Sequence, residues 1–325
     1  MTVGVAARNE EATIEHSLRS IDDALTELPG DVTVEVIVAV NGSTDQTRQI
    51  ADDHATGRTH YRVIETDAGL VEAQRAIARA ADTADYLIFV DADCLLDRHC
   101  LRVLAEVMED RTVQATWATR ALVGPTRPGF WRGLLNFGDY HPDVILRGHY
   151  LVGQAFAIRR YDVPYGSPHR EPQPAKVVTH LQLDRGPLTD DSYLSRSLIA
   201  GFGREAIRPA AGAIVYSHPM RSLRDLYRAQ RRKAYEVERL NMLFPELRTI
   251  RGKHFGRRID AAAYARLSRI ARLQCRLYLP LYANLWRLAQ WQLAASLRLL
   301  RWGVPLRPCD IWPVVEGTKK PFPAT

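Results

Sequence analysis

The sequence predicts an α/β protein with a doubly wound, mostly parallel sheet and a helical C-terminal extension. Over the first 120 residues, short apolar runs rich in β-branched residues alternate with amphipathic helical patterns. From residue 222 to Pro305 the pattern is almost entirely helical and rich in arginine. The chain has 325 residues, 46% of them apolar, which suffices for one large domain with appendages or for two domains.

The predicted strands of the first part are continuous apolar runs, as is typical of strands buried on both faces. They cover residues 2–7, 33–40, 60–65, 85–90 and 112–118. The predicted helices between them cover residues 10–28, 44–56, 70–82 and 97–109. Asn9 is a candidate N-cap for the first helix, and the Ser and Thr residues of "STDQT" (43–47) are candidates for the second. Alternating strands and helices imply right-handed crossovers and parallel strands.

Polar residues follow four of these strands at their carboxyl ends. They are Arg8-Asn9-Glu10, Asn41-Gly42-Ser43, Asp67-Ala68-Gly69 and Asp91-Ala92-Asp93. Ligands of doubly wound sheets bind outside the carboxyl ends of the strands. We therefore expect these four segments to line one edge of the sheet together.

Regularity falls after residue 120. A helix is predicted over residues 130–147, and a strand over 153–160 begins at Gly153. Residues 161–187 contain five prolines and predict a lid or binding loop. A helix over 188–202 follows, with Asp190 and Asp191 in its first turn, and a strand over 212–218 ends at His218.

Asp91 and Asp93 follow the most apolar strand of the chain, "YLIFV". Two carboxylates one residue apart repel each other, and a divalent cation would neutralise them. Oxygen ligands favour Mg²⁺ or Mn²⁺, which also bind substrate phosphates. An Asp-X-Asp motif is weak by itself, and taken alone it favours the alternative, a solvated turn.

Charge is distributed unevenly along the chain. Residues 1–220 carry 22 Lys and Arg against 30 Asp and Glu, whereas residues 221–307 carry 20 against 5. This asymmetry predicts an anionic partner for the C-terminal part: phosphate, a membrane surface or nucleic acid. Arg266, Arg269, Arg272 and Arg276 recur at helical spacing beside apolar residues and form a basic amphipathic face. The favoured interpretation of this face is a solvated surface or an intramolecular partner for acidic helices, and contact with a membrane is the alternative.

The sequence predicts a cytoplasmic protein without disulfides. Its four cysteines contain no C-x-x-C pair, and Met1 leads directly into an apolar strand rather than a signal peptide. The most apolar late window, residues 277–300, contains Pro280, Arg287 and Arg298 and is too polar for a transmembrane helix.

Four segments, taken in order, resemble the donor-binding half of family 2 glycosyltransferases, which have the GT-A fold. They are "VGVAARNEEATIEHSLRSI", "VIVAVNGSTDQTRQIA", "DAGLVEAQRAIARA" and "YLIFVDADCLL". "LTDDSYLS" (188–195) then matches the place of an acidic pair, usually Glu-Asp, that supplies the catalytic base in this family. "YRAQRRKAYE" (227–236) matches the place where many members have Q-x-x-R-W. The resemblance covers about residues 2 to 240.

The resemblance implies a role for each part of the chain. Residues 1–120 would bind the nucleotide-sugar donor, residues 121–220 would complete the same GT-A domain with the acceptor and catalytic residues, and residues 221–325 would form the basic helical region. The donor nucleotide would contact Ala7, Glu10, Asn41, Arg75 and Asp91, and the metal would be held by Asp91, Asp93 and His218. The diphosphate would contact Gln230, Arg231, Arg232 and Lys233. The acceptor or sugar would contact Gly153 and Gln154, and Asp191, or Asp190 beside it, would be the general base.

The implied reaction is metal-dependent, inverting transfer of a sugar from a nucleotide diphosphate, with a UDP-sugar as the expected donor and Mn²⁺ or Mg²⁺ as the cofactor. Expected acceptors are a carbohydrate, a lipid-linked compound or a small molecule, with peripheral contact to the inner face of the plasma membrane and no nucleic acid. The alternatives are a sugar-nucleotide nucleotidyltransferase, or a catalytically silent nucleotide-binding or membrane-associated scaffold. "AARNEE" after the first strand is not the Gly-rich phosphate loop of a nucleotidyltransferase.

Four residues depart from the family pattern. Asp190 replaces the Glu of the usual Glu-Asp pair, which leaves the assignment of the base between Asp190 and Asp191 ambiguous. Asn41 stands where members usually have an Asp for the base of the nucleotide, which puts the identity of that base in doubt. Lys233 and Ala234 replace the Arg and Trp of Q-x-x-R-W, which argues against a processive polysaccharide synthase.

Each assignment has a purely structural alternative. Glu10 could be an acidic residue in the first turn of a helix, Asn41 could be a turn residue, and Arg75 could be a solvated helix residue, which is the favoured interpretation of Arg75. His218 could be a capping or core residue, and Asp190 and Asp191 could cap a helix. Gln230 to Lys233 could form a solvated helix face.

Overall fold

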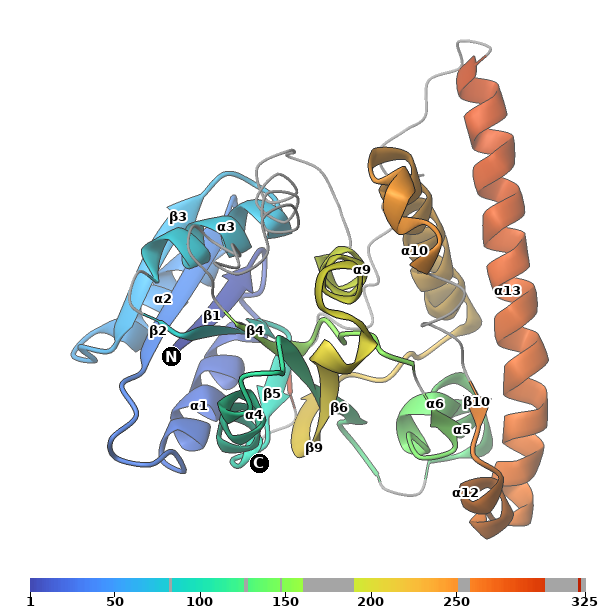
Figure 1. Ribbon diagram of the computed structural model, residues 1–325, viewed down its shortest axis with the longest axis horizontal. Helices are drawn as coiled ribbons and strands as arrows, with labels where there is room; N and C mark the ends of the chain where they lie inside the picture. The colour runs from blue at the N-terminus through green and yellow to red at the C-terminus, as the bar shows by residue number, and fades with distance from the viewer. Residues whose placement is uncertain are drawn as a thin grey trace.

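The computed structural model describes residues 1–81, 84–125, 128–146, 148–159, 190–250, 258–301 and 321–322. Its centre is an eight-stranded sheet with the strand order β3-β2-β1-β4-β8-β6-β9-β5 (Figure 1). Helices cover both faces of this sheet, so the predicted doubly wound α/β fold is confirmed.

The first four strands are all parallel to one another. They are β1 (Thr2–Ala7), β2 (Glu35–Asn41), β3 (Tyr61–Thr66) and β4 (Tyr86–Asp91), joined by the helices α1 (Ile14–Leu25), α2 (Thr47–Ala55) and α3 (Leu70–Ala80). Side chains alternate between the two faces of the sheet: Val3 and Val5 pack with α1, and Ile37 and Ala39 pack with α3. Because apolar residues are buried on both faces of the sheet, the sequences of these strands are continuous apolar runs.

The second half of the sheet is mixed. Its elements are β5 (Cys94–Leu96), α4 (Cys100–Glu109), β6 (Ala115–Leu122), α5 (Phe130–Leu135), α6 (Phe137–Tyr140), β7 (Ile145–Leu146), β8 (Ala155–Arg159), α9 (Asp190–Phe202), the 3₁₀ turn η1 (Arg204–Ala206) and β9 (Ile207–Ser217). β8 is antiparallel to both of its neighbours, β4 and β6, whereas β9 is parallel to β6. The carboxyl ends of β4, β6 and β9 and the start of β8 therefore lie at the same edge of the sheet.

The C-terminal helices stand beside this sheet. They are α10 (Leu223–Leu243), α12 (Ala261–Arg266) and α13 (Arg269–Arg301), with the 3₁₀ turn η2 (Pro245–Leu247) and the strand β10 (Arg258–Ile259), which pairs with β7. The long helix α13 runs along the outside of α10 at one end of the molecule (Figure 1). Its inner face packs Cys275 and Tyr278 against Phe137 and Ile145. Within the described part of the chain, no helix is both long and apolar enough to cross a membrane.

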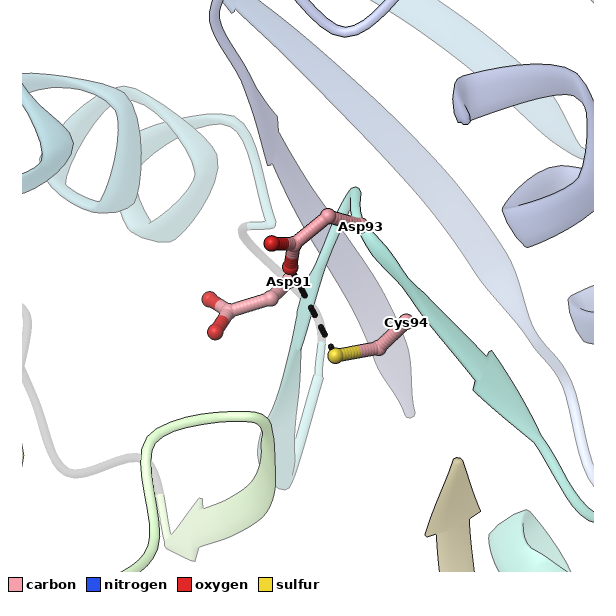
Figure 2. Close-up of side chains that lie close together, drawn as sticks. All are labelled: Asp91, Asp93 and Cys94. Atoms are coloured by element: carbon pink, nitrogen blue, oxygen red, sulfur yellow. Dashed lines mark hydrogen bonds between the residues drawn. The ribbon is translucent and has the colours of Figure 1, made fainter. Parts of the chain in front are cut away.

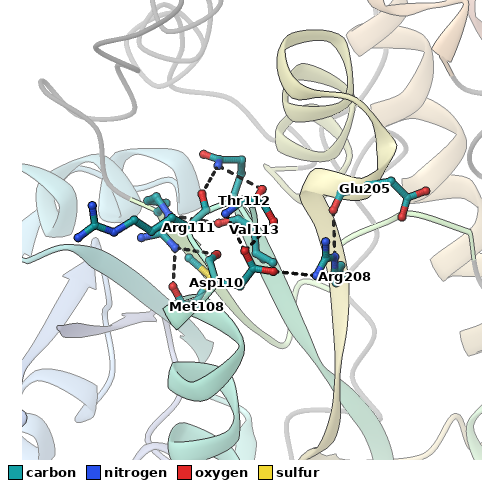
Figure 3. Close-up of polar contacts among 9 residues, drawn as sticks. Met108, Asp110, Arg111, Thr112, Val113, Glu205 and Arg208 are labelled. Atoms are coloured by element: carbon teal, nitrogen blue, oxygen red, sulfur yellow. Dashed lines mark hydrogen bonds and ion pairs between the residues drawn. The ribbon is translucent and has the colours of Figure 1, made fainter.

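Polar contacts join β6 and β9 at the edge where both strands begin (Figure 3). The Arg208 guanidinium binds the Asp110 carboxylate at 2.9 Å and donates to the Glu205 carbonyl oxygen at 3.2 Å. Hydrogen bonds from Thr112, and the charge of Arg208, lower the pKa of Asp110. These contacts link the starts of the two strands.

The predicted helix over residues 130–147 is wrong in its length. The segment forms the short helices α5 and α6 and then the two-residue strand β7. The break falls at Asn136, whose side chain bonds the backbone of Met220 in both directions, and Pro142 follows soon after α6. The Pro-rich segment 161–187, predicted to be a lid, lies outside the described residues.

Candidate active site

The turn between β4 and β5 presents two carboxylates. Asp91 is the last residue of β4, and its backbone N–H donates to the Gln154 carbonyl oxygen at 2.9 Å. The carboxylates of Asp91 and Asp93 point to the same side of the turn (Figure 2). Candidate ligand atoms of Asp91, Asp93 and Cys94 all lie within 4.8 Å of one another. The two carboxylates fit a hard divalent cation, because such a cation would relieve their mutual repulsion.

Cys94 is not suited to bind this cation. Its side chain is fully buried, and its thiol donates to Asp93 Oδ1 at 3.6 Å. Burial, and then the negative charges of Asp93 and Asp91, raise the pKa of the thiol well above its usual value. Cys94 therefore stays protonated and supports Asp93 as a weak hydrogen-bond donor.

His218 lies next to this turn through strand pairing. β5 pairs with β9 so that Cys94 is opposite Ser217, which places the backbone of His218 beside that of Asp93. The imidazole is buried and stacks on Phe322, with ring centroids 4.6 Å apart. Among the described residues, the group of candidate ligands does not include His218. A metal-binding role for His218 stays a prediction.

The loops after β1 and β2 are joined by hydrogen bonds. Asn9 has a positive φ of 53°, donates its N–H to Ser43 Oγ at 3.1 Å and accepts from the Thr44 N–H at 2.9 Å. The Glu10 N–H donates to Thr47 Oγ1 at 2.8 Å. Asn9, Ser43, Thr44 and Thr47 were predicted to cap helices, and this is wrong because their side chains join the two loops. The N-cap positions are Thr13 and Gln46.

The residues predicted to bind the nucleoside lie at this same edge. Glu10 and Asn41 are only 9% and 3% exposed, and Glu10 accepts a hydrogen bond from Thr13 Oγ1 at 2.9 Å. Ala7 is buried and pairs with Val40, while Ala6 pairs with Asp91. The parallel register thus brings the ends of β1, β2 and β4 to one edge, as the sequence predicted.

Arg75 is more enclosed than a solvated helix residue. Its side chain is 12% exposed and forms an ion pair with Glu72 at 3.1 Å. Its Nε and Nη2 atoms are buried without a hydrogen-bond partner among the described residues. The favoured interpretation of Arg75 as a solvated residue is therefore wrong, and its free N–H groups suit an anionic ligand.

Asp191 opens helix α9 with two differently placed oxygens. Oδ2 accepts a hydrogen bond from the Tyr150 hydroxyl at 2.8 Å, and that hydroxyl also lies 3.0 Å from Ser192 Oγ. Oδ1 is buried and has no hydrogen-bond partner among the described residues. Burial raises the pKa of Asp191, while Lys233 and the hydrogen bonds from Tyr150 and Ser192 oppose this change. The side chain of the neighbouring Asp190 lies outside the described residues.

Helix α10 brings Lys233 to the same group. The Lys233 ammonium lies 5.3 Å from the centroid of the Tyr150 ring. Gln230 is buried, so the interpretation of this segment as a solvated face is wrong for that residue; Arg231 and Arg232 are partly exposed. The sequence reasoning missed Tyr150, which lies in an irregular segment and belongs to no motif.

The chain belongs to glycosyl transferase family 2, whose family model matches residues 2–163. It is therefore a glycosyltransferase. A comparison with curated proteins found no match.

Three solved structures are similar to this chain at low sequence identity. A mannosyltransferase from Pyrobaculum calidifontis, in complex with GDP-Man and Mn²⁺, is 20% identical over 95% of this chain and 81% of that chain, with a TM-score of 0.49. Glucosyl-3-phosphoglycerate synthase from Mycobacterium tuberculosis is 20% identical over 69% of this chain and 74% of that chain, with a TM-score of 0.42. TarS from S. aureus is 17% identical over 74% of this chain and 39% of that chain, with a TM-score of 0.43.

Proposed function

We propose that this glycosyltransferase is metal-dependent and inverting, uses a nucleotide-diphosphate sugar, and takes Asp191 as its general base. The main observation behind this proposal is the position of the dipeptide Gly153-Gln154. The Gln154 carbonyl oxygen accepts from the Asp91 N–H, and a Cβ added to Gly153 would be in van der Waals contact with Asp191 Oδ2, at 3.7 Å. Two consecutive residues therefore adjoin the candidate metal ligands on one side and the candidate base on the other.

The donor would lie along the carboxyl ends of β1, β2 and β4. Ala7, Glu10 and Asn41 would contact the nucleoside, and Asp91 the ribose. A divalent cation, Mn²⁺ or Mg²⁺, held by Asp91 and Asp93 would supply positive charge to the diphosphate leaving group. A UDP-sugar is the donor that we test first, and GDP- and dTDP-sugars are tested beside it, because the Asn41 amide offers a hydrogen-bond donor and an acceptor that suit either a pyrimidine or a purine.

In this proposal, Asp191 activates an acceptor hydroxyl. Tyr150 occupies Oδ2 and leaves Oδ1 to take the proton. As the proton leaves, the acceptor oxygen forms a bond to C1 of the sugar, and the bond from C1 to the diphosphate oxygen breaks on the opposite face. This single displacement inverts the anomeric centre. Asp190 is the alternative base, one residue earlier.

A thermal-shift screen of UDP-, GDP- and dTDP-sugars, each with and without Mn²⁺, tests the donor class. We expect stabilisation that needs both the metal and one nucleotide. The absence of any shift would favour the silent scaffold. Release of pyrophosphate from a nucleoside triphosphate and a sugar phosphate would favour the nucleotidyltransferase.

The variant Asp93→Ala tests whether metal-dependent nucleotide binding needs the Asp93 carboxylate. It removes a partly exposed ligand from the end of a strand rather than from the core, so the fold should be kept. Calorimetry with UDP and Mn²⁺ should show no metal-dependent binding by the variant. Unchanged affinity would mean that the carboxylate pair only forms a turn.

We also propose that helix α13 contacts an anionic membrane surface. Its exposed apolar residues Ile270, Leu273 and Leu277 are 63%, 49% and 43% exposed. The exposed cations Arg269, Arg272 and Arg276 recur at the same spacing. An exposed face with these two kinds of side chain suits the interface of an anionic bilayer, where each cation contributes about 1 kcal/mol.

A further inference from the structure

A cavity of about 630 Å³ lies beside the proposed active site, where β6 and β9 end. Its lining includes Trp131 and Arg132 of α5 and His218 and Arg221 of the loop after β9. In the strand order, the nucleoside-binding ends of β1 and β2 lie on one side of β4, and β6 and β9 lie on the other. Because His218 is beside Asp93, the cavity borders the candidate metal site on the side away from the nucleoside.

The cavity carries uncompensated positive charge. Its described lining contains Arg132 and Arg221 and no Asp or Glu. Arg132 Nη2 donates to the Val123 carbonyl oxygen at 2.8 Å, and its guanidinium lies against Gly124, where a Cβ would collide with it. Arg132 Nε is buried and lacks a hydrogen-bond partner within the described residues. The guanidinium is thus held in place while part of its donor capacity remains unused.

The wall of the cavity is rigidly joined to the sheet. Buried Asn136 donates to the Met220 carbonyl oxygen at 2.9 Å and accepts from the Met220 N–H at 2.7 Å. The Arg120 guanidinium donates to the His218 carbonyl oxygen at 3.1 Å and also binds Asp139. Asp139, the nearby acid of α6, therefore already has a cationic partner and does not neutralise the cavity.

We propose that this cavity binds the anionic group, a phosphate or a carboxylate, of the acceptor. The guanidinium groups of Arg132 and Arg221 suit such groups because they offer charge-assisted hydrogen bonds in a planar arrangement. Trp131, which is 68% exposed, provides an apolar surface for the carbon atoms of the same molecule. The assignment of the anion to the acceptor rests on the proposed function, since the donor would fill the other side of Asp93.

Trp131 gives a direct readout of binding. The chain has six tryptophans, so 5-fluorotryptophan labelling should give six ¹⁹F resonances, and Trp131→Phe identifies the one from the cavity. Glycerol 2-phosphate, glycerate and glycerol serve as the phosphate, carboxylate and neutral probes. We expect a saturable shift of the Trp131 resonance with at least one of the two anionic probes and none with glycerol; the two anionic arms show which group is preferred.

Arg132→Gln and Arg221→Gln should each weaken this binding by about tenfold or more, because each removes a charge-assisted hydrogen bond. The matched control is Arg224→Gln, which removes the same charge from an exposed position next to the cavity and should leave the affinity unchanged. Loss of binding in all three variants alike would overturn the proposal, and so would the absence of any shift with either anion.

A second arm separates the acceptor from the donor. UDP with Mn²⁺ should leave the Trp131 resonance in place; displacement of the anionic probe by UDP would assign the cavity to the donor diphosphate and overturn the proposal. Because these titrations need no sugar transfer, they remain decisive even if the enzyme proves to lack the proposed mechanism. That mechanism is tested separately by hydrolysis of the donor in the absence of acceptor, which the control variant Arg224→Gln should not change.

Discussion

At the Asp191 carboxyl group, one oxygen is bound by Tyr150 and the other is buried without a partner among the described residues. A buried oxygen without a donor costs stability, and this cost supports the proposed role of Asp191 as a proton acceptor. The sequence predicted Asp191 from the acidic pair in "LTDDSYLS". It could not predict Tyr150, because the contact depends on how residues 148–154 approach α9.

Asp191→Asn should lower turnover by about 10²–10⁴-fold and leave donor affinity within a few-fold of the original. The amide keeps the shape of the side chain and removes its basicity. Single-turnover kinetics with calorimetry of donor binding separate the two quantities. Asp190→Asn is the control at the neighbouring position and should lower turnover by a smaller factor than Asp191→Asn. If Asp190→Asn were inactive and Asp191→Asn active, the base would be one residue earlier.

Lys233→Met should move the acidic limb of the turnover–pH profile to higher pH. Burial raises the pKa of Asp191, and Lys233 opposes this, so loss of the cation raises the pKa further. The base works only when ionised, so turnover falls as the pH falls through this pKa. Lys233→Arg keeps the charge and should keep the limb near its original position. A purely structural role would lower the plateau in both variants without moving the limb.

The same pKa gives a stability signature. A carboxyl group with a raised folded-state pKa contributes stability below its unfolded pKa, and this contribution is lost as the pH rises through the folded pKa. The Tm difference between Asp191→Asn and the original protein should therefore increase in favour of the variant as the pH rises. Thermal unfolding across pH 4 to 8 measures this; a pH-independent difference would mean that the pKa is not raised.

At the scale of elements, the strands and helices of residues 1–109 were predicted well, because each strand is an apolar run and each helix has an amphipathic period. β5 was missed because three residues are too few to show a period, and β7 and β10 are shorter still. The helix starts were misplaced because Ser43, Thr47 and Asn9 bind a neighbouring loop. Local capping preference cannot anticipate a partner that lies 34 residues away, as Ser43 does from Asn9.

The proposed membrane binding depends on helix α13. Ile270→Asp combined with Leu273→Asp should abolish co-sedimentation with anionic liposomes at low salt, because both side chains are exposed and would have to enter the interface. High salt should weaken binding of the original protein through screening. Leu288→Asp, farther along the same helix and also exposed, is the control. Binding that the double variant retains would show that the charges alone suffice.

At the scale of the whole molecule, the site is assembled from both halves of the chain. The proposed donor edge comes from residues 1–93, whereas the proposed base and the cavity come from residues beyond 120. The sequence predicted the first part because parallel strands bring their ends together by rule. The second depends on β8 lying antiparallel between β4 and β6, which periodicity does not reveal.

Leu96→Ala tests how far the turn at Asp93 depends on the distant strand β9. Leu96 is 5% exposed and pairs with Val215. Its truncation to Ala should lower the free energy of unfolding by about 2–5 kcal/mol. Leu104→Ala, fully buried in α4, is the control of similar cost. Only Leu96→Ala should weaken metal-dependent UDP binding measured well below the Tm. Equal loss in both variants would mean that β5 does not support the site.

The pairing of β5 with β9 also sets the order in which a growing chain can complete the turn. Asp97 and its partner Tyr216 are 119 residues apart. At a synthesis rate of about 5–20 residues per second, roughly 6–24 s pass between the emergence of the two segments. During this interval β1 to β4 can already pair, whereas β9, with which β5 pairs just after Asp93, has not yet been synthesised. A ribosome-bound chain that ends before β9 should therefore hold the donor edge without a finished metal site, so nucleotide would become a ligand only late in synthesis.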